Sequence, residues 1–120
     1  MPKVSVSIPC YNVCTYNEQG AEWLRTAIES VLTQTHTDIE LLLVNDGSTD
    51  DTVCLLREFT DDDRVEVITQ DNRGYPGARN TGIEEGDGEY YAFIGQDDVW
   101  EPQLLERQLA YLESSEDNVV

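Results

Sequence analysis

Apolar residues with two different spacings follow one another along this chain. Val4, Val6 and Ile8 alternate with serines up to Pro9, which predicts a strand. Residues 39–44 are almost continuously apolar, as in a strand that is buried on both faces. Between these runs, apolar residues recur at helical spacing at positions 24, 27, 28, 31 and 32, so we expect an amphipathic helix that ends near Thr35. The three segments together predict a β-α-β unit.

The same order of elements continues along the rest of the chain. Residues 46–51 form a predicted loop with N-cap candidates, and apolar residues between 53 and 59 supply the next helix. We expect a strand at 65–69, a short helix at 77–83, a strand at 90–94 and a helix whose first residue is Pro102. This alternation predicts a single α/β domain over residues 1–120, with a Rossmann-like, mostly parallel sheet and helices on both faces.

The net negative charge of the chain limits which partners it can bind. The 120 residues include 25 acidic and 7 basic ones, and the formal net charge of −18 argues against nucleic acid as a partner. The acidic residues are scattered through predicted loops and helix faces, which suggests the surface of a salt-adapted (halophilic) protein.

With no membrane-spanning apolar run and no signal-peptide profile, the chain is expected to be cytoplasmic. Cys10, Cys14 and Cys54 are expected to be reduced thiols.

Polar residues follow each predicted strand, where parallel sheets bind ligands. The loops read PCYN from Pro9, NDGS from Asn45, DNRG from Asp71 and QDD from Gln96. One carboxylate of the pair Asp97 and Asp98 could bind a divalent cation whose other ligands are diphosphate oxygens and water, although such a pair is also common in solvated turns. Asp46 could accept an N–H from a base, although Asp-Gly-Ser is also ordinary turn chemistry.

Three further residues have two interpretations each. Tyr11 could stack on a base or fill the end of the sheet. Arg79 and Arg73 could pair with diphosphate oxygens or form surface ion pairs. The only histidine, His36, is expected in a turn. The chain has no Gly-rich phosphate-binding motif of the dehydrogenase or P-loop type, so those two classes are disfavoured.

Four segments resemble, in order, the N-terminal half of family 2 glycosyltransferases: VSVSIPCYN, AIESVLTQTHTDIELLLVNDGSTDDT, NRGYPGARNTGIEEGDGEYYAFIGQDDVWEP and LLERQLAYL. The resemblance covers nearly the whole chain. It implies the GT-A fold. It also implies that Asp98 coordinates a Mg²⁺ or Mn²⁺ ion bridging the donor diphosphate, with Asp97 at the ribose or at the water shell of the metal.

The resemblance further implies a nucleotide-sugar site. Asp46 would contact the N3–H of uracil, Tyr11 would pack against the base with Pro9 completing that wall, and Arg79 would help to hold the donor. A carboxylate at N3 favours uracil or thymine over cytosine, because cytosine presents an acceptor there. The expected donor is therefore a UDP-sugar, with a dTDP-sugar as second choice.

Two departures from the family pattern bear on these roles. Asn45 stands where the family usually has an Asp, and residues 13–23 form an insertion-like stretch that leaves open whether Tyr11 or Tyr16 stacks on the base. The family's catalytic base is expected beyond Val120, and the resemblance also allows attachment to a membrane through segments beyond that residue. These residues would thus carry the donor half of an inverting, metal-assisted glycosyltransferase with a glycan, lipid or protein acceptor.

Three other functions use a similar sheet. A non-catalytic nucleotide-binding or interaction module of the same fold remains the alternative. A nucleotidyltransferase would carry a Gly-rich, basic loop after the first strand, and a receiver domain would need a Lys after a late strand. Neither feature occurs in the sequence.

Overall fold

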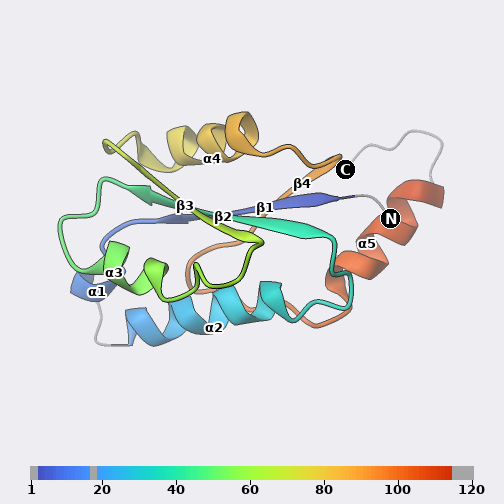
Figure 1. Ribbon diagram of the computed structural model, residues 1–120, viewed down its shortest axis with the longest axis horizontal. Coiled ribbons are helices and arrows are strands. Elements are labelled where there is room, and N and C mark those ends of the chain that lie inside the picture. Colours follow the sequence, from blue (N-terminus) through green and yellow to red (C-terminus); the bar gives the residue numbers. More distant parts are fainter. Residues whose placement is uncertain (1–2, 17–18, 115–120) are drawn as a thin grey trace.

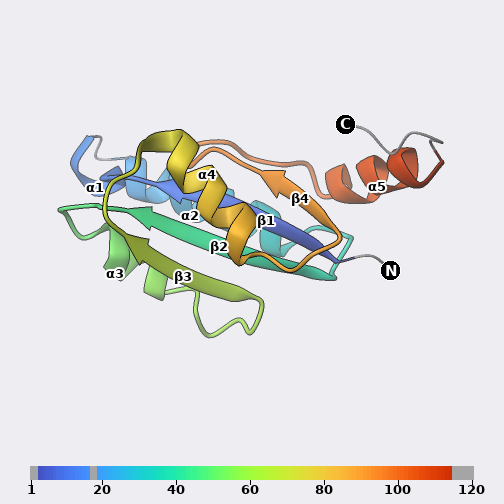
Figure 2. The ribbon, with the colours of Figure 1, turned by 90° about the horizontal axis from the view of Figure 1, so that it is seen from above.

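Four parallel strands form one sheet in the computed structural model, which describes residues 3–16 and 19–114. The strand order is β3-β2-β1-β4 (Figures 1 and 2). The strands are β1 (Val4–Cys10), β2 (Ile39–Asp46), β3 (Val65–Gln70) and β4 (Tyr90–Phe93). The helices are α1 (Val13–Tyr16), α2 (Gly20–Leu32), α3 (Thr52–Arg57), α4 (Gly74–Glu85) and α5 (Leu104–Ser114). The parallel α/β sheet predicted from the sequence is confirmed.

Helices cover both faces of the sheet, and the alternating residues of β1 match the two layers. Figure 1 shows α4 above the sheet and α2 and α3 below it. Val4, Val6 and Ile8 belong to the main hydrophobic core, together with buried leucines and isoleucines of α2, β2 and α3. Ser5 and Ser7 lie on the opposite face, toward α4. Side chains alternate between the faces of a strand, so this arrangement follows directly from the sequence of β1.

Helix α4 lies unusually close to β1. A Cβ atom added at Gly82 would lie 2.4 Å from the Oγ of Ser7, and one at Gly86 would lie 2.9 Å from the Cβ of Ser5. Ser7 Oγ is buried without a hydrogen-bond partner among the described residues. Glycine facing serine therefore allows the helix backbone to approach the strand, which fixes the position of α4 over the sheet.

Some element boundaries differ from those predicted. Helix α4 begins at Gly74 rather than residue 77, because Pro76 lies in the first turn, where its missing N–H costs no hydrogen bond. Helix α5 begins at Leu104, two residues after Pro102. The stretch 13–23, expected to be a loop, contains the short helix α1 and the start of α2. His36 lies in the irregular connection before β2, as expected, but its side chain is buried. No helix within the described ranges is long and apolar enough to cross a bilayer.

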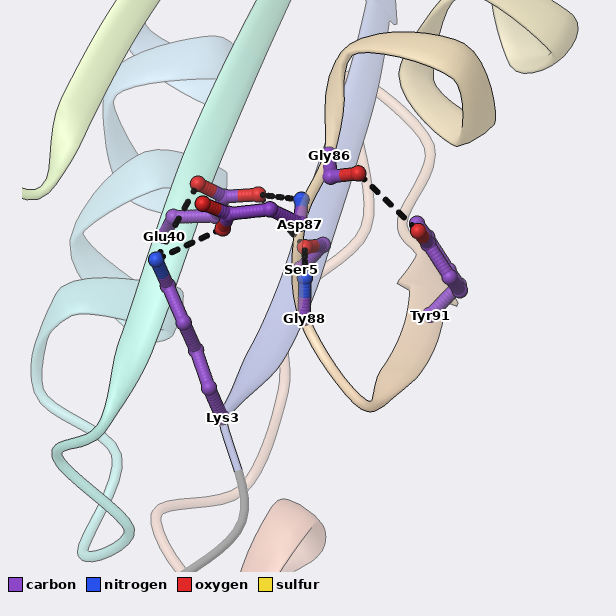
Figure 3. A network of polar contacts seen from close by, with 7 residues as sticks. All are labelled: Lys3, Ser5, Glu40, Gly86, Asp87, Gly88 and Tyr91. Atoms are coloured by element: carbon purple, nitrogen blue, oxygen red, sulfur yellow. Dashed lines mark hydrogen bonds and ion pairs between the residues drawn. The ribbon is translucent and has the colours of Figure 1, made fainter.

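A polar network fastens the connection between α4 and β4 at the amino ends of the strands (Figure 3). Glu40 Oε1 accepts hydrogen bonds from Ser5 Oγ at 2.6 Å and from the backbone N of Asp87 at 2.7 Å. Lys3 Nζ lies 2.7 Å from Asp87 Oδ1 and 3.5 Å from Glu40 Oε2. The hydrogen bond between Lys3 and Asp87 raises the pKa of the lysine and lowers that of the aspartate. Gly88 N donates to Ser5 Oγ at 2.8 Å, so the loop is held by both β1 and β2.

Replacing the central carboxylate of this network should reduce stability. Glu40→Gln removes the charge from an acceptor of two short hydrogen bonds, and we expect the free energy of unfolding to fall by about 1 kcal/mol. Urea denaturation in molar KCl measures the change. Glu66→Gln, at an exposed position of β3, makes the same change in net charge and is the control. An equal effect of the two substitutions would show that the network contributes nothing specific.

Candidate functional site

A cavity of about 390 Å³ lies at the carboxyl edge of the sheet. Residues at or just after the carboxyl ends of all four strands contribute to it. Its lining consists of Pro9, Cys10, Tyr11, Asp46, Asn72, Gly74, Tyr75, Ala78, Gly95, Gln96 and Asp97. Of the residues predicted to bind a nucleotide-sugar or metal, Pro9, Tyr11, Asp46 and Asp97 line this cavity, whereas Arg79 and Asp98 do not.

A second hollow of about 520 Å³ lies between β4 and α5. Its lining is largely apolar and aromatic and includes Tyr90, Leu109 and Leu112. Polar groups from four loops converge on the cavity at the carboxyl edge and not on this hollow. The former is therefore the candidate functional site.

Asp46, the last residue of β2, is held in a fixed orientation. Its side chain is buried, and Oδ1 accepts hydrogen bonds from Gln70 Nε2 at 2.9 Å and from the backbone N of Arg73 at 2.8 Å. Its carbonyl oxygen accepts a third bond, at 3.1 Å, from Asn72 Nδ2. No bond from the described residues reaches Oδ2. One oxygen of this carboxylate is thus satisfied by protein donors, the other receives none from the described residues, and the residue itself lines the cavity.

The turn after Asp46 requires glycine. Gly47 has a φ of 75°, and a Cβ atom there would lie 2.6 Å from the backbone N of Asn72. Asn45 Oδ1 accepts a hydrogen bond from Ser48 N at 3.3 Å. A carboxylate could accept the same bond, so Asn45 serves this turn in place of the Asp that the resemblance implies. The Asp-Gly-Ser segment therefore acts as a turn and also presents a carboxylate to the cavity.

The loop after β1 is tied to two neighbouring loops. Asn12 has a φ of 47°, its Oδ1 accepts from Thr49 N at 2.8 Å, and its N donates to Ser48 Oγ at 3.0 Å. Tyr11 N donates to Gln96 Oε1 at 3.2 Å, which links β1 to the loop after β4. Tyr11 is 37% exposed at the cavity wall. The side chain of Tyr16, the other candidate for stacking on a base, lies outside the described residues.

Asp50 joins the loop after β2 to the first helix. It accepts hydrogen bonds from Thr52 N at 2.9 Å and from Thr15 Oγ1 at 2.8 Å, and also from Thr52 Oγ1. Burial raises the pKa of Asp50, but the hydrogen bonds from the two threonines outweigh burial, and the pKa lies below its ordinary value of 3.8. Thr52 Oγ1 also accepts from Val13 N at 3.1 Å. Asp50 therefore indirectly braces the segment that carries Tyr11.

Removing the charge of Asp50 should destabilise the protein in a pH-dependent way. Because the folded-state pKa is depressed, the ionised carboxylate contributes stability above pH 3.8, and this contribution is lost as the pH falls through the folded-state pKa. We expect Asp50→Asn to lower the free energy of unfolding by about 1 kcal/mol at neutral pH and by less in acid. Urea denaturation between neutral and acid pH measures the difference. Asp51→Asn, at the exposed neighbouring position, is the control. A pH-independent difference would contradict the assignment.

Asp97 and Asp98 present two exposed carboxylates beside the cavity. Asp98 Oδ2 accepts a hydrogen bond from Gly95 N at 3.2 Å, and a Cβ atom at Gly95 would lie 2.7 Å from that oxygen. Within residues 3–16 and 19–114 there is no group of three or more His, Cys, Asp or Glu side chains that could hold a metal ion. The pair fits a hard divalent cation only as part of its ligand set, with the remaining oxygens coming from a ligand and water.

Arg79 stacks on aromatic rings next to the cavity. Its guanidinium carbon lies 4.3 Å from the centroid of the Phe93 ring and 5.8 Å from that of Tyr75. Tyr75 in turn lines the cavity. The charge of Arg79 is thus held near the site by cation–π contacts.

Sequence reasoning placed Asn72 and Gln96 in candidate loops without giving them a role, and it missed Gln70, Tyr75 and Phe93. Each lies within a few residues of a predicted motif, and Gln70, Asn72 and Gln96 are polar residues at or just after strand ends. A polar residue at the end of a predicted strand was therefore the signal that could have assigned them to the site. Which of them contact one another depends on strand register, which the spacing of residues alone does not give.

Comparison with known proteins decides the family. A model of glycosyl transferase family 2 matches residues 5–120. This chain belongs to glycosyltransferase family 2. The family predicted from the sequence is confirmed.

Over the aligned region, curated relatives are about two fifths identical to this family 2 chain. An uncharacterised glycosyltransferase of Nostoc sp. is 40% identical over 116 residues, which are 95% of this chain and 34% of the relative. An uncharacterised glycosyltransferase of Rickettsia bellii is 40% identical over 94% of this chain and 15% of its own length. The putative glycosyltransferase EpsH of Bacillus subtilis is 41% identical over 90% and 30%. The chain therefore spans only about a third or less of these relatives.

Solved structures confirm the GT-A fold. TarS of Staphylococcus aureus, residues 1–349 in complex with UDP-GlcNAc, superposes with a TM-score of 0.75 at 26% identity, over 92% of this chain and 31% of that one. The mannosyltransferase PcManGT of Pyrobaculum calidifontis, solved with GDP-Man and Mn²⁺, superposes with a TM-score of 0.82 over 96% of this chain and 33% of that one. The latter is 22% identical and supports the fold alone.

Proposed function

We propose that this chain forms the donor half of an inverting glycosyltransferase that takes a sugar from a UDP-sugar, or secondarily a dTDP-sugar. Asp46 carries the proposal, because one oxygen of its buried carboxylate is bound by protein donors while the residue lines a cavity at the carboxyl edge of the sheet. TarS, solved with UDP and with UDP-GlcNAc, is 26% identical to this chain, which supports a uridine nucleotide.

The chemistry of Asp46 selects the base. An ionised carboxylate only accepts hydrogen bonds, so Oδ2 would bind a base that carries a proton at N3, as uracil and thymine do. Cytosine would place a lone pair against the same oxygen and leave a buried carboxylate unsatisfied. Pro9 and Tyr11, on the cavity wall, would pack against the base.

The negative charge of the site would repel a diphosphate unless a cation binds with it. Asp46 and Asp97 line the cavity and Asp98 lies beside it, so a diphosphate would meet carboxylates. Among the described basic residues, Lys3, Arg25, Arg64 and Arg107 are already in ion pairs. We therefore propose that Asp98, aided by Asp97, holds Mg²⁺ or Mn²⁺. Such an ion, when bound, neutralises charge on the departing diphosphate.

The remaining roles in the proposed reaction follow from these positions. Arg79, stacked on Phe93 beside Tyr75, would add one positive charge near the diphosphate. Asp46, Tyr11 and Pro9 would orient the donor so that its anomeric carbon faces the acceptor. The base that deprotonates the acceptor hydroxyl would come from a longer form of the protein. We propose a glycan, a lipid or a protein as the acceptor. We also propose that the acidic surface is an adaptation to high salt.

Calorimetry with UDP tests the proposal. In molar KCl with Mn²⁺, we expect UDP to bind at least roughly tenfold more tightly than CDP. Asp98→Asn should remove the part of the UDP affinity that depends on Mn²⁺, because one ligand oxygen loses its charge. Asp63→Asn, at an exposed position between α3 and β3, makes the same charge change away from the site and should leave binding unchanged.

Two outcomes would contradict the proposal. One is a folded wild-type protein that binds UDP no better than CDP. The other is UDP affinity that depends neither on Mn²⁺ nor on Asp98. Selective UDP binding by a longer form of the protein that hydrolyses or transfers no sugar would instead support the non-catalytic nucleotide-binding module.

A further inference from the structure

The hydrogen bonds that hold Asp46 continue beyond it to α4. Asp46 and Gln70 are register partners on β2 and β3, so their side chains lie on the same face of the sheet. Gln70 Nε2 donates to Asp46 Oδ1 at 2.9 Å. Thr81 Oγ1, buried on α4, lies 2.5 Å from Gln70 Oε1. A continuous chain of bonds thus runs from α4 through β3 to the carboxylate at the end of β2.

The charge of Asp46 fixes the direction of these bonds. An ionised carboxylate accepts only, so the amide of Gln70 must turn its NH₂ group toward Asp46 and its oxygen toward Thr81. The single hydroxyl proton of Thr81 then goes to Gln70 Oε1, although the carbonyl oxygen of Gly77 is also within 3.1 Å. Turning the amide over would place its oxygen against the carboxylate. The three side chains therefore form one ordered relay.

Close packing keeps the origin of the relay in place. Thr81 precedes Gly82, the residue at which α4 approaches Ser7 of β1. Movement of Thr81 away from β3 would require α4 to leave this contact. The orientation of the Asp46 carboxylate consequently depends on side chains that do not line the cavity.

We infer that Gln70 and Thr81 are positioning residues that set the base specificity of the site by orienting Asp46. This inference rests on the proposed function, in which Asp46 Oδ2 accepts the N3–H of uracil. A hydrogen bond is strong only within a narrow range of distance and angle. Rotation of the carboxylate would therefore weaken the contact that separates uracil from cytosine.

The ratio of the affinities for UDP and CDP is the quantity to measure. The two ligands share one diphosphate, so its binding and its titration cancel in the ratio. We expect wild-type protein to give a ratio above one that is constant over the neutral pH range, well above the pKa of cytosine N3 and below that of uracil N3.

Gln70→Glu is the informative substitution, because the two side chains have the same shape. A protonated Glu can donate to Asp46 as the amide does, whereas an ionised one repels it, and the pair shares one proton over a range of pH. The ratio should approach the wild-type value at the acid end and fall roughly tenfold as the pH rises. A purely structural role would not produce this pH profile.

A second pair of variants is independent of the added charge. Thr81→Val removes the hydroxyl while keeping the volume, and should lower the ratio several-fold at all pH values. Thr81→Ser keeps the hydroxyl and should restore the ratio relative to Thr81→Val. Far-UV circular dichroism in molar KCl shows whether each variant is folded.

The outcomes separate this inference from the proposed function. A pH-dependent ratio in Gln70→Glu, together with restoration by Thr81→Ser, supports the relay. If wild-type protein prefers UDP but the ratio stays at the wild-type value in both Gln70→Glu and Thr81→Val, the relay is wrong and the proposed donor stands. If wild-type protein shows no preference for UDP, both are overturned.

Discussion

The register between β2 and β3 is the constraint on which the site depends. It pairs Asp46 with Gln70 at the carboxyl ends of the two strands, on the face covered by α4. A shift of one residue would turn Gln70 to the opposite face and leave the buried carboxylate without its amide partner. The register is itself fixed by burial, because Leu41 and Leu43 of β2 and Val65 of β3 must all reach the core on the other face.

The face under α4 carries a polar network at each of its two edges. The two networks differ in whether both oxygens of the central carboxylate contact a donor from the protein. At the amino edge, Glu40 accepts from Ser5 and from the backbone of Asp87, and Lys3 completes the cluster. At the carboxyl edge, protein donors reach only one oxygen of Asp46. The first network closes a connection of the fold, whereas the second holds a carboxylate in place and presents it to a cavity. The small residues between them, Ser7 and Gly82, allow one helix to cover both.

The helices and strands could be predicted from the sequence because their buried side chains recur at regular spacing. The apolar run of β2 and the helical spacing of α2 are set by which side chains lie inside, and both elements appear within a few residues of the predicted positions. Helix α4 was predicted too short because its sequence, GYPGARNTGIEE, contains a proline and three glycines and shows little amphipathic pattern. Gly82 allows the helix to approach Ser7 of β1, and Gly74 has a φ of 75°. Neither requirement can be recognised from the spacing of apolar residues.

The site was predictable at the level of loops and not of contacts. Pro9 and Asp46 lie at the carboxyl ends of β1 and β2, and Tyr11 and Asp97 lie in the loops after β1 and β4. Parallel strands bring their carboxyl ends to one edge, so the convergence of these residues follows from the fold. The stacking of Arg79 on Phe93 and the bond from Gln70 to Asp46 join segments distant in sequence. These contacts depend on the packing of α4 and on strand register. The roles assigned to the residues of the site in binding remain predictions.

The position of a bound nucleotide is the most direct test of this account. Amide ¹H–¹⁵N spectra of labelled protein, recorded in molar KCl with and without UDP and Mg²⁺, report on both ends of the sheet at once. If the nucleotide binds at the carboxyl edge, the largest shifts will be at the backbone amides of Tyr11 and Arg73, which bond to Gln96 and Asp46. Gly88, in the opposite network, will change little. Largest shifts at Gly88 or along α5, with Tyr11 and Arg73 unchanged, would contradict it.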